Sequence, residues 1–358
     1  MRLQEYKAPD FSLPVFISAP DVILAEAEQD GLVPKGYHAT SIYPEYFKIG
    51  GEWRLIERSR MDCAVVVRDG MPYAVEHRNV RKGDSVALGR TENGTSGIYM
   101  HMDGFMSEAE ERDGFAFRGS RTRETSYSRD YDSLYELLRY EKEHGFVVWV
   151  LGPACTFDFD SRRAMSSLVR RGYVHALFGG NALATHDLEA AVFRTALGQD
   201  IYTQRSIPNG HYHHLDTINL VRESGGIREF IRARHIEDGI MASVVHCNIP
   251  YVLAGSIRDD GPLPDVIANV YEAQAQMRAH LTQATTVIAL ATQLHAIATG
   301  NMTPSYVIKE GVIRPVSFYT VDVSEFAVGK LHDRGSLSAR SIVTNVQDFL
   351  VNLERGLK

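Results

Sequence analysis

The sequence predicts a two-domain α/β protein, in which a parallel-sheet domain follows a smaller β-rich N-terminal domain. From about residue 131, apolar runs of strand length alternate with segments of helical period, which is typical of parallel α/β sheets. Before about residue 118, short apolar runs are separated by turn residues. We therefore place the domains at residues 1–118 and 119–358, and interpret the polar segment 105–130 as a connector.

The first domain contains a predicted hairpin. Residues 60–68 and 71–75 are two apolar runs, and Asp69-Gly70 between them is a typical two-residue hairpin turn. A further turn and strand are predicted at 81–89.

The second domain contains five predicted strands with helices between them. Continuous apolar runs such as 146–151 are typical of parallel strands that are buried on both faces. The helix at 131–144 stops at Gly145, a residue that often terminates helices. The predicted strands are 146–151, 173–178, 251–254, 286–290 and 316–321. The predicted helices are 131–144, 161–171, 183–197, 264–281 and 326–331, with a further short helix after strand 286–290.

The composition is typical of a globular protein, with 44% hydrophobic and 23% charged residues. The net charge of -7 does not provide the basic surface that a nucleic-acid partner needs. No apolar run approaches the roughly 20 residues of a membrane span, and the first residues lack the apolar core of a signal peptide. We expect a cytoplasmic protein without a nucleic-acid or membrane partner.

The cysteines agree with a reducing compartment. There are three, at positions 63, 155 and 247, and they are far apart in the sequence. An odd number at these spacings predicts neither a disulfide framework nor a zinc site. Cys63 lies inside an apolar run, so we interpret it as a small buried hydrophobic residue rather than a nucleophile.

Glycine and polar residues follow every predicted strand of the second domain. In open α/β sheets, ligands bind outside the carboxyl ends of the strands, and glycines there let backbone N–H groups approach phosphates. One such loop would indicate only a tight turn, whereas five together indicate a dinucleotide site on a Rossmann-like sheet. Asp322, at the end of the last strand, is a candidate acceptor for ribose hydroxyls. The loops are 152–154, 179–182, 255–261, 291–295 and 322–324.

Two polar clusters are candidates for substrate contact. Arg258, Asp259 and Asp260 form a dense charge cluster, in which the arginine suits a carboxylate and the aspartates suit an amine. The alternative is a loop ion pair of little consequence. Segment 210–214 contains three histidines but only Asp216 as a nearby further ligand, so we expect no metal site. Substrate contact or proton transfer and structural hydrogen bonding both remain open for these histidines.

His186 and Asp187 follow the second glycine loop, just inside a predicted helix. Either they form a capping pair, or they face the crevice at the strand ends. The sequence favours neither interpretation.

Several of these segments resemble a known family. They are similar to the archaeal and cyanobacterial type of ornithine cyclodeaminase, which also occurs as the C-terminal part of arginine dihydrolase fusions. The region is shared with bifunctional lysine-ketoglutarate reductase/saccharopine dehydrogenase proteins. Members often carry a further N-terminal domain, which we expect this chain to lack. The resemblance extends from about Gly36 to the end and is strongest at 177–187, 210–214, 252–264, 290–295 and 333–336.

The resemblance implies a tightly held NAD that is used catalytically. A hydride leaves Cα of L-ornithine, the δ-amine attacks the resulting imine, ammonia leaves, and the returning hydride gives L-proline. Arg258 is then the candidate partner of the substrate carboxylate. Asp260, Asp187 and His213 are candidates for the base that the α-amine requires. The implied cofactor contacts are Asn181, Ala182, Gly255, Ser256, Thr292, Gln293, Leu294, His295, Asp322 and Asp333.

Three other interpretations remain open at this point. The same fold would serve a cyclodeaminase for another diamino acid such as lysine, a net amino-acid dehydrogenase, or a regulatory protein that binds NAD without turnover. Acidic residues and an arginine on the strand-end loops favour an enzyme. We expect a small-molecule amino-acid substrate and a homo-oligomer, since the β-rich first domain suits self-association.

Overall fold

A seven-stranded parallel sheet organises the C-terminal part of the chain, from residue 147 to residue 343. In the computed structural model, which describes residues 4–105, 127–324 and 338–358, every neighbouring strand pair of this sheet runs parallel. The strand order is β13-β12-β9-β8-β14-β17-β18. The predicted α/β class with a Rossmann-like sheet and a smaller β-rich N-terminal part is confirmed. The strands are β8 (Val147–Leu151), β9 (Ala176–Gly180), β12 (Tyr251–Ala254), β13 (Val266–Ile267), β14 (Thr286–Leu290), β17 (Ser317–Asp322) and β18 (Ser338–Val343).

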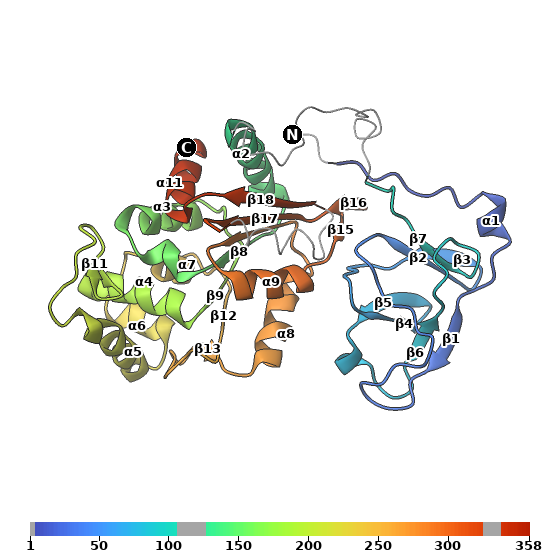
Figure 1. Ribbon diagram of the computed structural model, residues 1–358, viewed down its shortest axis with the longest axis horizontal. Helices are drawn as coiled ribbons and strands as arrows, with labels where there is room; N and C mark the ends of the chain where they lie inside the picture. Colours follow the sequence, from blue (N-terminus) through green and yellow to red (C-terminus); the bar gives the residue numbers. More distant parts are fainter. Residues whose placement is uncertain (1–3, 106–126, 325–337) are drawn as a thin grey trace.

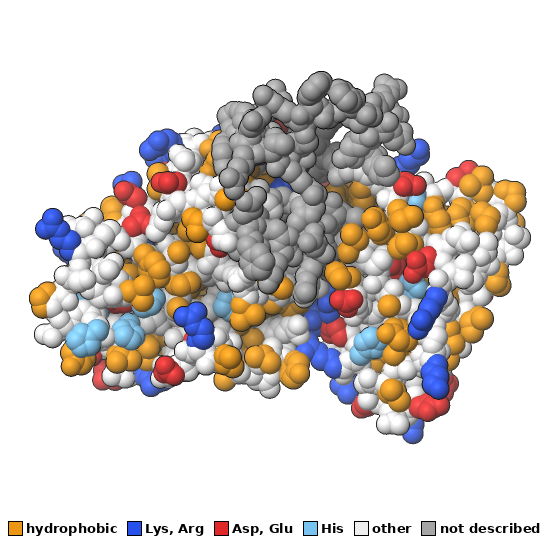
Figure 2. Space-filling model, in the orientation of Figure 1, with side chains coloured by type: hydrophobic (Ala, Val, Ile, Leu, Met, Phe, Trp, Pro, Cys, Tyr) orange, Lys and Arg blue, Asp and Glu red, His pale blue; other side chains and the backbone are white. Residues whose placement is uncertain are grey.

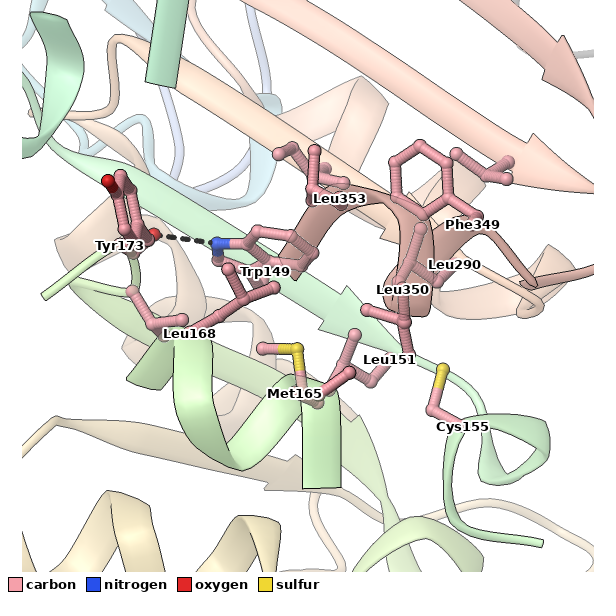
Figure 3. Close-up of a cluster of buried hydrophobic side chains, with 14 of the residues drawn as sticks. Trp149, Leu151, Cys155, Met165, Leu168, Tyr173, Leu290, Phe349, Leu350 and Leu353 are labelled. Carbon is pink, nitrogen blue, oxygen red and sulfur yellow. Dashed lines mark hydrogen bonds between the residues drawn. The ribbon is translucent and has the colours of Figure 1, made fainter. Parts of the chain in front are cut away.

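Both faces of the sheet are buried, as the continuous apolar runs predict. Trp149 and Leu151 of β8 belong to one core cluster, while Val148 and Val150 belong to another. Figure 3 shows the first cluster, in which the Trp149 indole N–H donates to the Tyr173 carbonyl at 2.9 Å. This face is covered by α2 (Tyr127–His144), α3 (Phe159–Arg170), α7 (Ile240–His246) and α11 (Val346–Gly356), and the other by α8 (Val270–Leu281) and α9 (Gln293–Met302).

Three further helices pack beside α7 at the β12–β13 edge. They are α4 (Asn181–Phe193), α5 (His213–Ser224) and α6 (Ile227–Ala233), and their apolar side chains form a third cluster with Leu253 and Val266. The hairpin of β10 (Thr195–Ala196) and β11 (Gln199–Asp200) and the turn η3 (Gly210–Tyr212) lie between α4 and α5.

The N-terminal part contains two antiparallel sheets, with strand orders β1-β6-β4-β5 and β3-β2-β7. The predicted hairpin is confirmed, because β4 and β5 pair on either side of Asp69 and Gly70, whose φ angles are 50° and 73°. Cys63 is buried, as predicted, and burial raises its pKa. The elements are α1 (Pro14–Ile17), β1 (Ile23–Glu26), β2 (Glu45–Ile49), β3 (Glu52–Leu55), β4 (Ala64–Arg68), β5 (Met71–Val75), η1 (His77–Asn79), β6 (Ser85–Leu88) and β7 (Ile98–Met100).

The N-terminal strands lie on the side of the parallel sheet that carries α8 and α9 (Figure 1). Arg60 donates to the carbonyl of Asn301 at 2.7 Å, and Tyr306 donates to the carbonyl of Ile56. Tyr306 begins the small hairpin of β15 (Tyr306–Lys309) and β16 (Val312–Pro315). Figure 2 shows acidic and basic side chains interspersed over the coloured part of one face. No described helix is long and apolar enough to cross a membrane.

Some element boundaries differ from the predictions. The predicted helix 264–281 begins only at Val270, since Val266–Ile267 pairs as β13 and Asn269 caps the helix by accepting from two backbone N–H groups. The predicted helix 183–197 ends at Phe193, because Arg194 adopts a left-handed φ of 58° and the chain enters β10. The predictions missed α5, α6, α7, β18 and α11, and the predicted helix 326–331 lies outside the described residues.

Candidate functional site

The strand order of the parallel sheet reverses between β8 and β14, and the backbones of these two strands approach closely there. The Gly152 N–H donates to the Leu290 carbonyl at 2.8 Å. A Cβ on Gly152 would lie 1.9 Å from the Ala291 carbonyl oxygen, so only glycine fits at this position. A reversal of this kind is where open α/β sheets bind ligands.

A pocket of about 620 Å³ lies at this switch point. That volume is within the range of pockets that hold small ligands. It is lined by residues that follow β8, β9, β12 and β14, as the strand-end loops predict. The predicted cofactor contacts Asn181, Ala182, Ser256, Thr292, Gln293, Leu294 and His295 all line the pocket, as do the predicted substrate contacts Arg258 and Asp260.

Two helices begin at the pocket with N-terminal N–H groups that no described side chain caps. Helix α4 begins after Gly180 and helix α9 after Thr292, and neither has a side-chain cap or an acidic residue in its first turn. The first N–H groups of a helix have no intrahelical acceptor, and the helix dipole adds positive potential. The pocket therefore offers two anion-binding helix termini side by side, an arrangement that suits a pyrophosphate.

His295 brings an unpaired buried nitrogen to the same place. Its Nδ1 lies 3.3 Å from the Thr292 hydroxyl, whereas its Nε2 is buried without a described partner. Burial lowers the pKa of His295, so the neutral ring is favoured. A Cβ on Gly180 would come within 2.8 Å of the His295 ring, so the glycine makes room for this histidine. A buried nitrogen of this kind calls for a ligand partner.

The β12 loop supplies the charged rim of the pocket. The Asp259 carboxylate accepts the Ser256 N–H at 2.8 Å and so fixes the turn. Arg258 and Asp260 are exposed at the rim, and neither forms an ion pair with a described residue. The two side chains are free to meet a ligand with a carboxylate and an amine.

Asp187, one of the candidate bases, does not line the pocket. Its carboxylate is fully buried, where it accepts from Arg162 Nε at 2.7 Å and from the backbone N–H groups of Ile240 and Met241 at 3.0 and 2.7 Å. Although burial opposes a charged guanidinium, the Asp187 and Asp238 carboxylates raise the pKa of Arg162. All of these contacts hold α7 against α3 and α4, so the structure gives Asp187 a structural role, and its role as a base remains a prediction.

His213, another candidate base, also lies outside the pocket lining. Its Nδ1 is 2.8 Å from the Thr195 hydroxyl, and its ring stacks on Phe193 with the centroids 4.6 Å apart. The structure instead brings two other histidines, His186 and His214, to the pocket wall. Of these two, only His214 belongs to the predicted segment 210–214, and a base role for His213 remains a prediction.

Three predicted cofactor residues are not part of the described pocket lining. Gly255 uses its N–H to bind the Ile267 carbonyl at 2.9 Å and holds β13 beside β12. Asp322 accepts the Ser324 N–H at 2.9 Å at the end of β17. Asp333 lies outside the described residues. A ribose contact from Asp322 remains a prediction.

The sequence reasoning did not select Glu189, which supports His186 from inside α4. The signal was present as a His-x-x-Glu spacing, because residues three apart lie on the same side of a helix. The described residues contain no group of three or more histidine, cysteine or acidic side chains that could hold a metal ion.

The fold and the pocket define a protein of the Rossmann-fold class with its ligand pocket at the switch point. The Rossmann-fold part of the C-terminal region of ArgZ-like arginine dihydrolases matches residues 134–353, and the first region of the same C-terminal part matches residues 44–126. The chain belongs to this family, and the resemblance predicted from the sequence is confirmed.

Similar proteins of known name agree with this assignment. The chain is 38% identical over 353 residues to the ornithine cyclodeaminase of Methanopyrus kandleri, covering 96% of this chain and 80% of that protein. It is 38% identical over 348 residues to the bifunctional arginine dihydrolase/ornithine cyclodeaminase ArgZ of Synechocystis, covering 94% of this chain but only 47% of the fusion.

Two solved structures are similar over nearly the whole chain. One is a conserved LOR/SDH protein from Methanococcus maripaludis, with a TM-score of 0.85 and 34% identity over 94% of this chain and 98% of that one. The other is the ternary complex of AgrE with ornithine and NAD+, with a TM-score of 0.59 and 33% identity over 96% of this chain and 46% of that one.

Proposed function

We propose that this protein is an NAD-dependent ornithine cyclodeaminase, which converts L-ornithine to L-proline and ammonia. The observation that carries the proposal is the switch-point pocket, where two uncapped helix termini lie close to an exposed Arg258 and Asp260. The family assignment supports it, since relatives are named ornithine cyclodeaminases and AgrE has been solved with ornithine and NAD+.

The residues present fit a dinucleotide. The free N–H groups at the starts of α4 and α9 would hold the pyrophosphate, near Asn181, Ala182 and Gln293. The unpartnered Nε2 of His295 is a further polar contact for the cofactor. When bound, NAD accepts a hydride from the substrate Cα and returns it to the cyclised product.

The protein's own side chains would orient the amino acid. Arg258 would bind the carboxylate and Asp260 an ammonium group, so that Cα faces the cofactor. Because the loop containing both follows β12 and the start of α9 follows β14, substrate and cofactor would enter the same pocket from neighbouring strands.

The decisive experiment follows the hydride. Purified protein with NAD is given L-ornithine deuterated at Cα, and the proline, ammonia and reduced nicotinamide are quantified. We expect equal amounts of proline and ammonia, no accumulation of reduced nicotinamide, and deuterium retained at Cα of proline. Stoichiometric reduced nicotinamide would instead identify a net dehydrogenase. Absence of ammonia release from L-ornithine would refute the proposal.

A pair of arginine variants tests the substrate orientation. Arg258→Gln removes a charge-assisted contact to the carboxylate, so we expect kcat/KM for L-ornithine to fall by roughly 10–100-fold with unchanged NAD affinity. Arg163→Gln removes an exposed arginine of α3 and serves as the control. Equal effects of the two variants would contradict the assigned role of Arg258.

A further inference from the structure

One histidine of the pocket wall is backed by a buried carboxylate. His186 and Glu189 lie three residues apart on α4, and Nδ1 of His186 is 2.8 Å from Oε2 of Glu189. His186 is 7% exposed and lines the pocket, whereas Glu189 is fully buried. The pair therefore connects the pocket to the protein interior through one hydrogen bond.

The hydrogen bonds around Glu189 all run toward its carboxylate. The Thr195 hydroxyl donates to Oε1 at 2.8 Å, and the Gly198 N–H reaches the same oxygen at 3.3 Å. The hydroxyl has one hydrogen, and it is used on Glu189. His213, whose Nδ1 is 2.8 Å from the same hydroxyl, must therefore donate to it. Glu189 is the common acceptor of this network.

The direction of these hydrogen bonds, toward the Glu189 carboxylate, fixes the tautomer of His186. An ionised carboxylate only accepts hydrogen bonds, so Nδ1 of His186 carries the hydrogen. In the neutral ring Nε2 then has a free lone pair. No hydrogen bond joins Nε2 to any residue that the structure describes, and the edge-on ring of Phe157, 5.8 Å away between centroids, helps to hold the imidazole in place. Since the ring lines the pocket, this lone pair is available to a ligand there.

Three other proton acceptors that line the pocket, Asp259, Asp260 and His295, lack such support. One Asp259 oxygen is occupied by the Ser256 N–H, and Asp260 is exposed, so water stabilises its carboxylate. His295 is oriented only by a 3.3 Å contact with the Thr292 hydroxyl, and Asp259 favours its protonated ring only from a distance, because no described carboxylate is hydrogen-bonded to the ring. A base oriented by a third group is the usual arrangement at catalytic sites.

We propose that His186 is the proton acceptor of this pocket and that Glu189 is its positioning residue. This proposal rests on the proposed function. An N–H bond of the substrate α-ammonium group breaks and an Nε2–H bond forms on His186, which leaves a neutral α-amine whose lone pair can assist departure of the hydride from Cα to the cofactor. Glu189 stabilises the resulting imidazolium. The same proton passes to the nitrogen that leaves as ammonia, so the ammonium ion carries it away and His186 returns to its starting form.

The first test measures the tautomer directly. The holoprotein is labelled with ¹⁵N-histidine, and the His186 signals are assigned by their loss in His186→Gln. We expect the Nδ1–H form in the wild type and a different tautomer balance in Glu189→Gln, where an amide replaces the acceptor. An Nε2–H form in the wild type would overturn the proposal, and this readout does not depend on turnover.

The second test measures turnover. We expect His186→Gln to lower kcat by about 10²–10⁴-fold while NAD affinity is unchanged. Glu189→Gln should lower kcat with little change in KM, and Glu189→Asp should restore part of the loss. The controls are His144→Gln and Glu223→Gln, which change exposed residues away from the pocket. Wild-type kcat in His186→Gln would overturn the proposal.

The two tests separate the present proposal from the proposed function. If the wild type releases no ammonia from L-ornithine, the function fails, and the tautomer measurement alone decides the His186–Glu189 assignment. If the wild type is active and His186→Gln is equally active, the function stands and the assignment fails.

Discussion

Replacing Asp187 by asparagine should strongly lower the free energy of unfolding without abolishing the turnover of L-ornithine. The Asp187 carboxylate is the buried partner of Arg162 and accepts two backbone N–H groups at the start of α7. Asparagine keeps one acceptor oxygen but leaves Asp238, whose side chain is 60% exposed, as the only described carboxylate that pairs with the guanidinium. Removing one partner of a buried ion pair costs about 3–5 kcal/mol, so we expect a loss of about 3 kcal/mol in the free energy of unfolding.

Urea unfolding followed by tryptophan fluorescence measures this loss. Trp149 lies in the core that α7 covers, and a Trp53→Phe background removes the other tryptophan. The matched control is Asp160→Asn, which breaks an exposed ion pair with Arg163 and should cost less than about 1 kcal/mol. If Arg162→Met is added to Asp187→Asn, part of the stability should return, because the unpaired buried charge is gone.

The result that would refute this reasoning is equally definite. If Asp187→Asn unfolds at the wild-type urea concentration but has lost ornithine turnover, Asp187 is a catalytic base after all. We expect the opposite, with kcat per folded molecule close to the wild-type value.

Three further predictions concern the strand ends and two half-buried histidines. Gly152→Ala should lower the free energy of unfolding by about 2–4 kcal/mol in urea melts, because its Cβ would clash with the Ala291 carbonyl and disrupt a backbone hydrogen bond. Gly180→Ala should weaken NAD binding in calorimetry and leave stability almost unchanged, since the only close atoms belong to the His295 ring and a side chain can move. Burial lowers the pKa of His175 and His295, so the unfolded chain binds more protons and stability should fall as the pH drops below about 6.5, which urea melts at several pH values measure.

Each of these has a control or a contrary outcome. Gly311→Ala, at a φ of 77° with no atom within 4 Å of the new Cβ, gives the cost of a left-handed alanine without a clash. Gly152 has a φ of −85° and carries no left-handed strain, so a Gly152→Ala loss below about 1 kcal/mol would contradict the close approach of β8 and β14. If Gly180→Ala binds NAD with unchanged affinity, the proposed contact between His295 and the cofactor is contradicted. Stability that is constant across this pH range would mean that the folded and unfolded chains take up the same number of protons, so that folding does not lower the pKa of these two histidines.

The sequence predicted the parallel sheet well because both faces of its strands are buried. Continuous apolar runs such as β8 and β14 have few alternatives in a globular protein. The strand-end loops were predictable from their glycines. The Ala291 carbonyl lies close to Gly152 and the His295 ring lies close to Gly180, so both positions favour a residue without a side chain. Where the chain forms short elements held by tertiary contacts, as at β10 and β13, the local pattern carried too little information.

The candidate base could not be selected from the sequence, for a geometric reason. His186 and Asp187 are adjacent, and adjacent residues of a helix point about 100° apart, so they cannot share a role. Helix α4 is buried around most of its circumference, and no polar face marks the side toward the pocket. Only the packing of α3 and α7, whose Arg162 and backbone N–H groups take Asp187, leaves His186 to the pocket. The choice of base thus depends on contacts with residues 25 and 53 positions away, which no local pattern encodes.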